Sequence, residues 1–231
     1  MVSSVSSSMA DGAMVEWDTR VFPTDKPGAI AEAVHFLRAG QVVAFPTDTV
    51  YGVGAHAFIE QAVALLYVVK DRPPEKFIPL LVTGSSDLPK IAQSVPDLAW
   101  RLAERFWPGA LTLVLPKAPC VPAIVSAGPG VAVRAPDHAV VRALIRALGA
   151  PLAATSANLS GGPSPATAAE VLAQLDRRVP LVLDGGPCRG GVPSTVLDLT
   201  QSPPRILREG AIPANELAEF LADDCSLAHR N

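Results

Sequence analysis

Cysteine is scarce in this chain of 231 residues, and no hydrophobic run is long. Cys120, Cys188 and Cys225 are odd in number, lie far apart and form no CxxC pair. The sequence therefore indicates neither a disulfide framework nor a thiolate metal site. Proline, glycine or a charged residue interrupts each apolar stretch before it reaches the roughly 18 residues that a membrane-spanning helix requires. We expect a soluble protein of the reducing cytoplasm that has no membrane association.

Excess positive charge and a leader peptide are also missing. The 19 basic and 22 acidic side chains give a formal net charge of −3, which argues against a general nucleic-acid binder because such proteins gather basic charge. Residues 1–15 are rich in serine but contain no Lys or Arg and no sustained apolar core, so we expect no signal or transit peptide there. We expect residues 1–20 to form a disordered N-terminal tail.

The chain has the composition of an ordinary globular protein, with 49% hydrophobic and 18% charged residues. Apolar residues with helical spacing, from Ile30 to Leu37, predict a helix over 27–38. Similar patterns predict helices over 60–69, 96–106, 166–175 and 215–221, and one between an N-cap at Asp137 and a stop at Gly149. Strands are predicted over 41–45, 79–82, 110–115, 131–134 and 152–154, and near residues 181, 196 and 206. This alternation predicts a single α/β domain, and the closely spaced late strands indicate a mixed parallel and antiparallel sheet.

Three short segments carry the polar chemistry of the sequence. FPTDTVYGVG at 45–54 and ATSANLSG at 154–161 place hydroxyls, an amide and glycines where a strand gives way to a loop. KDRP at 70–73 follows the predicted helix, and there Lys70 and Arg72 suit the recognition of phosphate or carboxylate. Together the three segments predict a binding cleft for small anions.

Each segment also has a plainer explanation. Lys70, Arg72 and Lys76 fit a solvated helix end, where cations stabilise the helix dipole. Ser156 and Asn158 fit a turn, because both residue types hydrogen-bond their own backbone in loops. The GxGxxA pattern that begins at Gly52 matches a dinucleotide fingerprint, but the acidic residue beyond it closes a helix instead of a strand. We therefore favour a simple tight turn at these glycines.

The co-occurrence of these segments with others favours the functional interpretation. Between about residues 27 and 213 the chain resembles the YrdC-like family of threonylcarbamoyl-AMP synthases. The resemblance rests on FPTDTVYGVG at 45–54, KDRP at 70–73, FWPGALTLVL at 106–115, VRAPDH at 133–138, ATSANLSG at 154–161, STVLDL at 194–199 and LREG at 207–210. It implies a single α/β domain with a twisted mixed sheet, flanking helices and an open anion-binding cleft. It also implies a catalytic domain over 21–213, a C-terminal helix and tail over 214–231, and the family's single-domain form.

The resemblance assigns roles to individual residues. It places a catalytic tetrad around ATP and the bound carbamate, formed by Lys70, Arg72, Ser156 and Asn158. Positions that match ATP contacts are Arg72, Lys76, Gly130, Ala154, Ser164 and Arg208. Positions that match L-threonine contacts are Thr49, Arg134, Ser156 and Ser194. Leu81 departs from the family pattern, since some members have a histidine there near the threonine, and that contact is not carried over.

The implied reaction joins L-threonine, bicarbonate and ATP into threonylcarbamoyl-AMP and pyrophosphate, for the modification of tRNA adenosine by a downstream tRNA threonylcarbamoyltransferase machinery. The enzyme would be a cytoplasmic nucleotidyltransferase. Mg²⁺ would arrive with ATP, with no metal held by the protein itself.

Two alternatives stay open. One is the carbamoyl-AMP-forming module of hydrogenase maturation, which belongs to a longer chain with Cys-rich zinc motifs. The other is an RNA-binding module that uses the same basic cleft, and weak RNA binding remains open with it.

Overall fold

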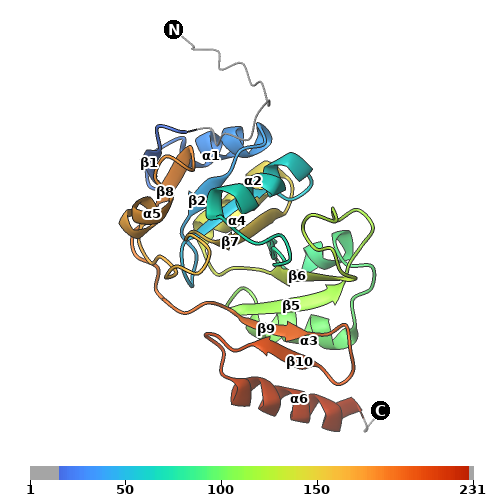
Figure 1. The fold of residues 1–231 in the computed structure, drawn as a ribbon. Helices are drawn as coiled ribbons and strands as arrows, with labels where there is room; N and C mark the ends of the chain where they lie inside the picture. The colour runs from blue at the N-terminus through green and yellow to red at the C-terminus, as the bar shows by residue number, and fades with distance from the viewer. Residues whose placement is uncertain (1–15, 229–231) are drawn as a thin grey trace.

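The computed structural model describes residues 16–228, with side chains up to residue 222. It contains one ten-stranded sheet with helices on both faces, and its strands follow the order β1-β8-β2-β3-β7-β4-β6-β5-β9-β10 (Figure 1). Parallel pairing joins β1 with β8, β2 with β8, β4 with β6 and β5 with β9, and the other neighbours are antiparallel. The predicted α/β class and mixed sheet are confirmed.

Short strands build this sheet, and most begin within two residues of the predicted positions. Their bounds are β1 Arg20–Pro23, β2 Val43–Phe45, β3 Gly52–His56, β4 Leu80–Leu81, β5 Leu111–Pro116, β6 Gly130–Arg134, β7 Leu152–Ser156, β8 Leu181–Asp184, β9 Thr195–Asp198 and β10 Arg205–Arg208. Strands β1 and β3 were not predicted.

The helices also follow the apolar spacing of the sequence. Their bounds are α1 Ala29–Arg38, α2 Glu60–Lys70, α3 Asp97–Phe106, α4 Ala139–Leu148, α5 Ala168–Leu175 and α6 Ala214–Ala228, with a 3₁₀ helix at Ser85–Lys90. One capping prediction is wrong. The N-cap of α4 is His138, without a side-chain cap, while Asp137 forms an ion pair with Arg142 at 3.6 Å. None of the helices in the described chain is both long and apolar enough to cross a membrane.

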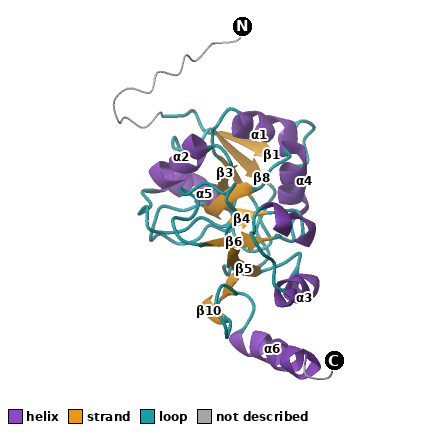
Figure 2. Cartoon of the chain, turned by 90° about the vertical axis from the view of Figure 1, so that its right-hand side faces the viewer, coloured by secondary structure: helices purple, strands orange, loops and turns teal. Residues whose placement is uncertain are grey.

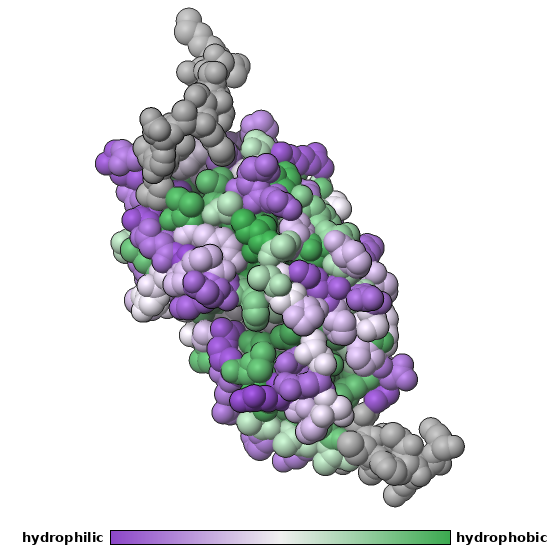
Figure 3. Space-filling view, turned by 45° about the vertical axis from the view of Figure 1, so that its right-hand side comes forward, coloured by the Kyte–Doolittle hydropathy of each residue, from purple (hydrophilic) through white to green (hydrophobic). Residues whose placement is uncertain are grey.

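Two apolar cores lie on opposite faces of the sheet. Helices α2, α3 and α5 bury Leu66, Leu102 and Val171 in one core, while α1 and α4 bury Leu37 and Leu144 in the other. Figure 2 shows α2 and α5 on one side of the strands and α1 and α4 on the other. On the face in Figure 3, hydrophobic residues reach the surface in small groups among hydrophilic ones. Burial of this kind is the main stabilising contribution to the fold.

The glycine pair Gly52 and Gly54 lies within strand β3, so the predicted tight turn is wrong. The aromatic ring of Phe45 packs directly over both residues. A Cβ atom on Gly54 would lie 2.9 Å from Phe45 Cε1, and one on Gly52 would lie 3.1 Å from Cε2. The glycines therefore allow a side chain to approach the strand closely. Because β3 pairs antiparallel with β2 and β7, the segment also lacks the geometry of a dinucleotide fingerprint.

The described chain begins five residues before the expected boundary at residue 21, and residues 1–15 of the expected tail lie outside it. The amide of Trp17 donates to Arg177 O at 2.9 Å, and Thr19 Oγ1 donates to Val179 O at 2.7 Å. Strand β1 then pairs with β8. These contacts attach residues 16–23 to the sheet edge.

One face of the sheet carries Ala154, Ser156 and Arg134, three of the residues that were predicted to bind ligands. In β7, Ala154 and Ser156 point to the same side because strand side chains alternate. Leu81 pairs in register with both Leu152 and Arg134, so Arg134 lies on this face as well. Helices α1 and α4 cover the face over the neighbouring strands, whereas Ala132 and other residues of β5, β6 and β9 on this face are only half-buried. The partly open region is where the candidate site forms.

Candidate functional site

Lys70 lies inside the protein, not at a solvated helix end. It is the last residue of α2, and only 1% of its surface is exposed. Its Nζ atom donates to the carbonyl oxygens of Ser156 and Asn158 and lies 3.4 Å from Asn158 Oδ1. Burial, followed by the charges of Arg72 and Lys76, lowers the pKa of Lys70 to about 7. The side chain therefore fastens the end of α2 to the 156–158 loop.

The 156–158 loop presents one hydroxyl and uses its amide internally. Asn158 Nδ2 donates to Leu159 O at 2.7 Å and to Gly162 O at 2.8 Å, so Asn158 shapes its own loop as the turn interpretation expected. Ser156 is half-buried at the end of β7. Among the described residues, no hydrogen bond engages its Oγ atom. The hydroxyl of Ser156 is thus the group of this loop that is free to contact a ligand.

Arg72 follows α2 and is only partly satisfied by the protein. Its Nη2 donates to Phe77 O at 2.7 Å, while its Nε is buried and has no hydrogen-bond partner in the described chain. Burial lowers the pKa of Arg72. Lys76 is exposed on the same loop. Because an unpaired buried donor is costly, the Nε group of Arg72 is suited to receive an anion.

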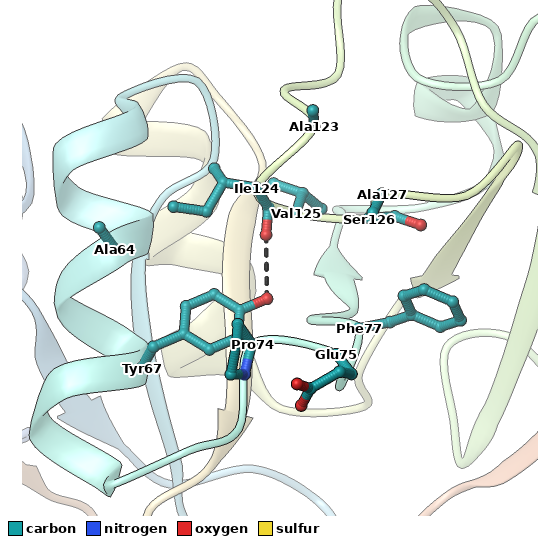
Figure 4. Close-up of a pocket in the computed structure, with 10 residues that line it drawn as sticks. All are labelled: Ala64, Tyr67, Pro74, Glu75, Phe77, Ala123, Ile124, Val125, Ser126 and Ala127. Atoms are coloured by element: carbon teal, nitrogen blue, oxygen red, sulfur yellow. Dashed lines mark hydrogen bonds between the residues drawn. The ribbon is translucent and has the colours of Figure 1, made fainter.

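A mostly apolar cavity of about 360 Å³ borders this cationic loop. Figure 4 shows Tyr67 of α2 and Phe77 of the loop on opposite sides of the cavity, with residues 124–127 between them. The hydroxyl of Tyr67 donates to Ile124 O at 2.9 Å, which fixes this wall. Phe77 is the most exposed large hydrophobic residue of the described chain, at 55%. An exposed aromatic ring beside a cavity favours a flat, apolar ligand group.

Arg134 forms the centre of a second polar cluster. Its Nη2 donates to Asp48 Oδ1 at 2.6 Å, Nη1 to Thr49 Oγ1 at 2.9 Å and Nε to Gly109 O at 2.8 Å. Arg134 and Asp48 are both largely buried, with side-chain exposures of 8% and 17%. Burial lowers the pKa of Arg134, and the charge of Asp48 opposes this shift. The guanidinium is therefore held in one orientation by three partners.

Ser194 and Arg208 lie close to this cluster. Arg208 Nη2 donates to Ser194 O at 2.8 Å and to Ser194 Oγ at 3.2 Å. Ser194 Oγ also shares a hydrogen bond of 2.8 Å with Thr112 Oγ1. Burial, and then the charge of Arg134, lowers the pKa of Arg208. A residue assigned to ATP and a residue assigned to threonine thus touch directly.

Two backbone hydrogen bonds tie the 46–51 loop, which carries Thr49, to neighbouring loops. The amide of Ala157 donates to Tyr51 O at 2.8 Å, which ties the 156–158 loop to the 46–51 loop. The amide of Gly191 donates to Thr49 O, also at 2.8 Å. The loop that Lys70 holds therefore lies beside the loop that contributes Thr49 to the Arg134 cluster.

The remaining residues that were predicted to contact a ligand are Gly130, Ala154 and Ser164. Gly130 begins β6, and Ala154 lies in β7 with its amide donating to Pro79 O at 2.9 Å. A ligand contact at Ala154 would thus use its carbonyl or its methyl group. Ser164 is half-buried beyond the 156–158 loop, and among residues 16–222 no hydrogen bond connects its side chain to the other predicted residues.

Sequence reasoning missed several polar residues of the site. Asp48 was not singled out, although it lies in the 45–54 motif, because its partner is 86 residues away. His138 received no role, yet its Nδ1 is buried without a partner in the described chain, and burial lowers its pKa. Tyr51 donates to Gly186 O at 2.8 Å. Within the described part of the chain, no group of three or more His, Cys, Asp or Glu side chains is arranged to hold a metal ion.

The fold and the geometry define an α/β protein with a mixed sheet and a cation-rich candidate site. The family model Sua5/YciO/YrdC, described as telomere recombination, matches residues 35–210. The chain belongs to this family.

Relatives of known name and structure support this membership. The chain is 43% identical over 192 residues to a threonylcarbamoyl-AMP synthase of Pyrococcus abyssi, and the match covers 83% of this chain and 56% of the relative. It is 45% identical over 190 residues to the Bacillus subtilis protein of that name, covering 81% and 55%. The crystal structure of P. abyssi Sua5 complexed with L-threonine superposes with a TM-score of 0.83 at 41% identity, covering 87% of this chain and 60% of that one. This chain thus spans little more than half the length of these relatives.

Proposed function

We propose that the protein is an L-threonylcarbamoyladenylate synthase. It joins L-threonine, bicarbonate and ATP, releases pyrophosphate, and supplies threonylcarbamoyl-AMP for the N6-threonylcarbamoyl modification of tRNA adenosine. In this proposal residues 21–213 form the catalytic domain. The names of the Pyrococcus and Bacillus relatives support the activity, and the threonine complex of P. abyssi Sua5 supports the amino acid.

The observation that carries the proposal is the connection between the two polar clusters. The hydrogen bond from Ala157 N to Tyr51 O, at 2.8 Å, sets the Arg134 cluster beside the loop that Lys70 holds. An amino acid bound at Arg134 would therefore lie next to cations suited to a nucleotide phosphate. Holding two anionic reactants in adjacent, cation-lined subsites is what a condensation of this kind requires.

The reaction needs positioning and charge stabilisation more than a protein nucleophile. The amine of threonine attacks the carbon of bicarbonate, and water leaves to give the carbamate. A carbamate oxygen then attacks the α-phosphorus, the bond to the β-phosphate oxygen breaks, and pyrophosphate leaves. The unpaired Nε of Arg72 stabilises negative charge on the carbamate and the α-phosphate, and the hydroxyl of Ser156 orients them. Lys70 and Asn158 act by holding the loop that carries Ser156.

The nucleotide occupies the side of the site near the 72–77 loop. The adenine base enters the cavity beside Phe77, and Lys76 faces the phosphates from the exposed loop. Additional contacts with ATP come from Gly130, Ala154, Ser164 and Arg208. Mg²⁺ arrives with the triphosphate, as it commonly does in enzymes that bind nucleotides, and offsets the phosphate charge.

The test is the substrate requirement for pyrophosphate release. We expect release from ATP only when threonine and bicarbonate are both present. Cleavage of ATP at the same rate with neither substrate would contradict the proposal. Release supported by carbamoyl phosphate in place of both substrates would instead identify a carbamoyl-AMP-forming activity.

A further inference from the structure

The chain leaves helix α2 through a left-handed turn at Asp71. The backbone of Asp71 has φ 50° and ψ 46°, a conformation that costs free energy for a residue with a Cβ atom. The amide of Asp71 donates to Val68 O at 3.2 Å, and that of Arg72 donates to Tyr67 O at 2.9 Å. These two bonds form a Schellman motif, in which glycine is the usual left-handed residue. Here an aspartate takes that place, so other contacts must offset the strain.

Arg178 supplies contacts that hold this turn. It follows helix α5, which lies on the same side of the sheet as α2 (Figure 2). Its Nη1 donates to Asp71 Oδ2 at 2.9 Å and to Val69 O at 3.2 Å. The amide of Ser160 donates to the next carbonyl, Lys70 O, at 2.8 Å. Together with the Schellman bonds, these contacts give each of the last four carbonyls of α2 a partner.

The backbone around Arg178 is itself fixed. The preceding residue, Arg177, has a positive φ of 62°, and apart from glycines Asp71 and Arg177 are the described residues with a positive φ. Thr19 Oγ1 accepts from Arg177 N at 2.8 Å and donates to Val179 O at 2.7 Å. Thr19 thus holds the backbone on both sides of Arg178, so the side chain that reaches α2 extends from a fixed turn.

We propose that Arg178 is a positioning residue for the candidate active site, because its bond to Asp71 holds the turn at the end of α2. Lys70 is directed inward to the carbonyls of the 156–158 loop, whereas Arg72 presents a buried Nε without a partner in the described chain. One residue lies between them, so the backbone conformation of Asp71 sets the direction of both side chains. The inference rests on the proposed function, in which Arg72 stabilises charge on the reacting groups.

The ion pair between Arg178 and Asp71 suits positioning more than stability. The side chain of Asp71 is 65% exposed and that of Arg178 is 25% exposed, and ion pairs near the surface contribute little to the free energy of unfolding. By contrast, a misplacement of about 1 Å in a group that acts on the substrate can cost about a hundredfold in rate. Loss of Arg178 should therefore affect turnover much more than unfolding.

Steady-state pyrophosphate release from ATP, threonine and bicarbonate tests this role. We expect Arg178→Ala to lower kcat roughly tenfold to a hundredfold. KM for threonine should stay within about threefold, because Arg72 is assigned to the nucleotide and the carbamate. The urea midpoint of unfolding should stay close to that of the unmodified protein. The matched control is Arg177→Ala, which removes an exposed ion pair with Glu16 from the same turn and should leave kcat unchanged.

A second substitution at Asp71 gives a readout that a merely structural role would not move. Glycine adopts the left-handed conformation without steric strain, so a turn with Asp71→Gly no longer depends on Arg178. We expect the double variant Arg178→Ala with Asp71→Gly to recover kcat to within about threefold of the unmodified protein. Asp71→Ala, which has neither the ion pair nor the freedom of glycine, should lose kcat as Arg178→Ala does.

The outcomes separate positioning from simple stabilisation. If Arg178→Ala lowers the unfolding midpoint but not kcat, or if Asp71→Gly does not restore kcat, the inference is overturned. Asp71→Ala decides in the same way if Arg178→Ala does not fold. An unmodified protein that releases no pyrophosphate would count against the proposed function. Amide hydrogen exchange at residues 71 and 72 then tests the turn itself, and equal protection in Arg178→Ala and the unmodified protein would overturn the inference.

Discussion

The ammonium group of Lys70 donates to the backbone carbonyl of Asn158, a residue 88 positions further along the chain. A buried cation is tolerated when hydrogen-bond acceptors surround it. Here the acceptors belong to the loop that presents Ser156, and Lys70 contacts the carbonyl of Ser156 as well. Lys70, at the end of α2, thus helps to set the position of the Ser156 hydroxyl at the end of β7.

Replacement of Lys70 by methionine should change how stability depends on pH. Burial and the nearby cations lower the pKa of Lys70 to about 7 in the folded protein, far below the value of about 10.4 in an unfolded chain. Between these values the unfolded state binds more protons, so stability rises with pH. The unfolding free energy of the unmodified protein minus that of Lys70→Met should therefore increase from about pH 7 to about pH 10.

Urea unfolding across this pH range measures the difference, with Lys90→Met as the control. Lys90 is a surface residue with 69% of its side chain exposed, and its replacement should leave the pH dependence unchanged. A difference that stays flat for Lys70→Met would mean that the carbonyl acceptors keep Lys70 protonated throughout.

Arg72→Ala should preserve the fold and reduce activity strongly. Truncation removes the hydrogen bond from Arg72 Nη2 to Phe77 O, but the Nε of Arg72 has no partner in the described chain, so the protein itself loses little. Loss of one partner of a buried charge pair costs about 2–5 kcal/mol, which corresponds to roughly thirtyfold to several-thousandfold in kcat/KM. Steady-state pyrophosphate release and circular dichroism measure the two effects. The control is Arg20→Ala, which removes an exposed ion pair with Glu32. If both variants show a similar small loss of kcat/KM, Arg72 is only a charge at the end of a helix.

Phe77→Ala should weaken ATP binding selectively. Phe77 is 55% exposed beside the cavity that we assign to the adenine base, and stacking on an aromatic ring is worth about 1–3 kcal/mol per base. We expect KM for ATP to rise roughly tenfold, with KM for threonine nearly unchanged. Phe58, at 39% exposure, lies outside the cavity lining, so Phe58→Ala should change neither constant. If Phe77→Ala and Phe58→Ala have the same KM for ATP, the adenine base does not bind beside Phe77.

Leu81→Ala should narrow the preference for threonine over serine. Leu81 lies in register with Arg134 on the same face of the sheet and is 6% exposed, so it is placed to contact the γ-methyl group that distinguishes the two amino acids. One methyl group in an apolar pocket is worth roughly 1–3 kcal/mol, or about tenfold to two-hundredfold. The ratio of kcat/KM for the two amino acids measures the effect.

Leu80→Ala is the matched control for this variant. Leu80 points to the opposite core, and both truncations should lower stability by about 2–5 kcal/mol. Only Leu81→Ala should change the ratio. If both variants lose activity equally toward threonine and serine, Leu81 is a core residue without a part in selectivity.

Local patterns in the sequence predicted most elements of the fold. The apolar spacing predicted a helix over 60–69, and helix α2 ends only one residue later, at Lys70. Strand β3 was missed because glycines have low strand propensity, and here they are tolerated because Phe45 packs over them. Strand β1 was missed because its four residues are mostly exposed and carry no periodic pattern.

The sequence predicted a set of site residues, and their roles in binding and catalysis stay predictions. Lys70 was expected to stabilise substrate charge, and the structure adds that it contacts backbone carbonyls of its own chain. The ion pair between Asp48 and Arg134 spans 86 positions, and no local spacing rule connects residues so far apart. Contacts of this kind arise from the pairing of strands, which composition and periodicity do not specify.

Mass spectrometry with labelled bicarbonate tests the proposed activity most directly. The protein is incubated with ATP, Mg²⁺, L-threonine and ¹³C-bicarbonate, and the products are compared with those from unlabelled bicarbonate. We predict a threonylcarbamoyl-AMP species whose mass increases by one ¹³C atom, since the carbamoyl carbon comes from bicarbonate. An adenylate product that forms without threonine, or one whose mass does not respond to the label, would contradict the account.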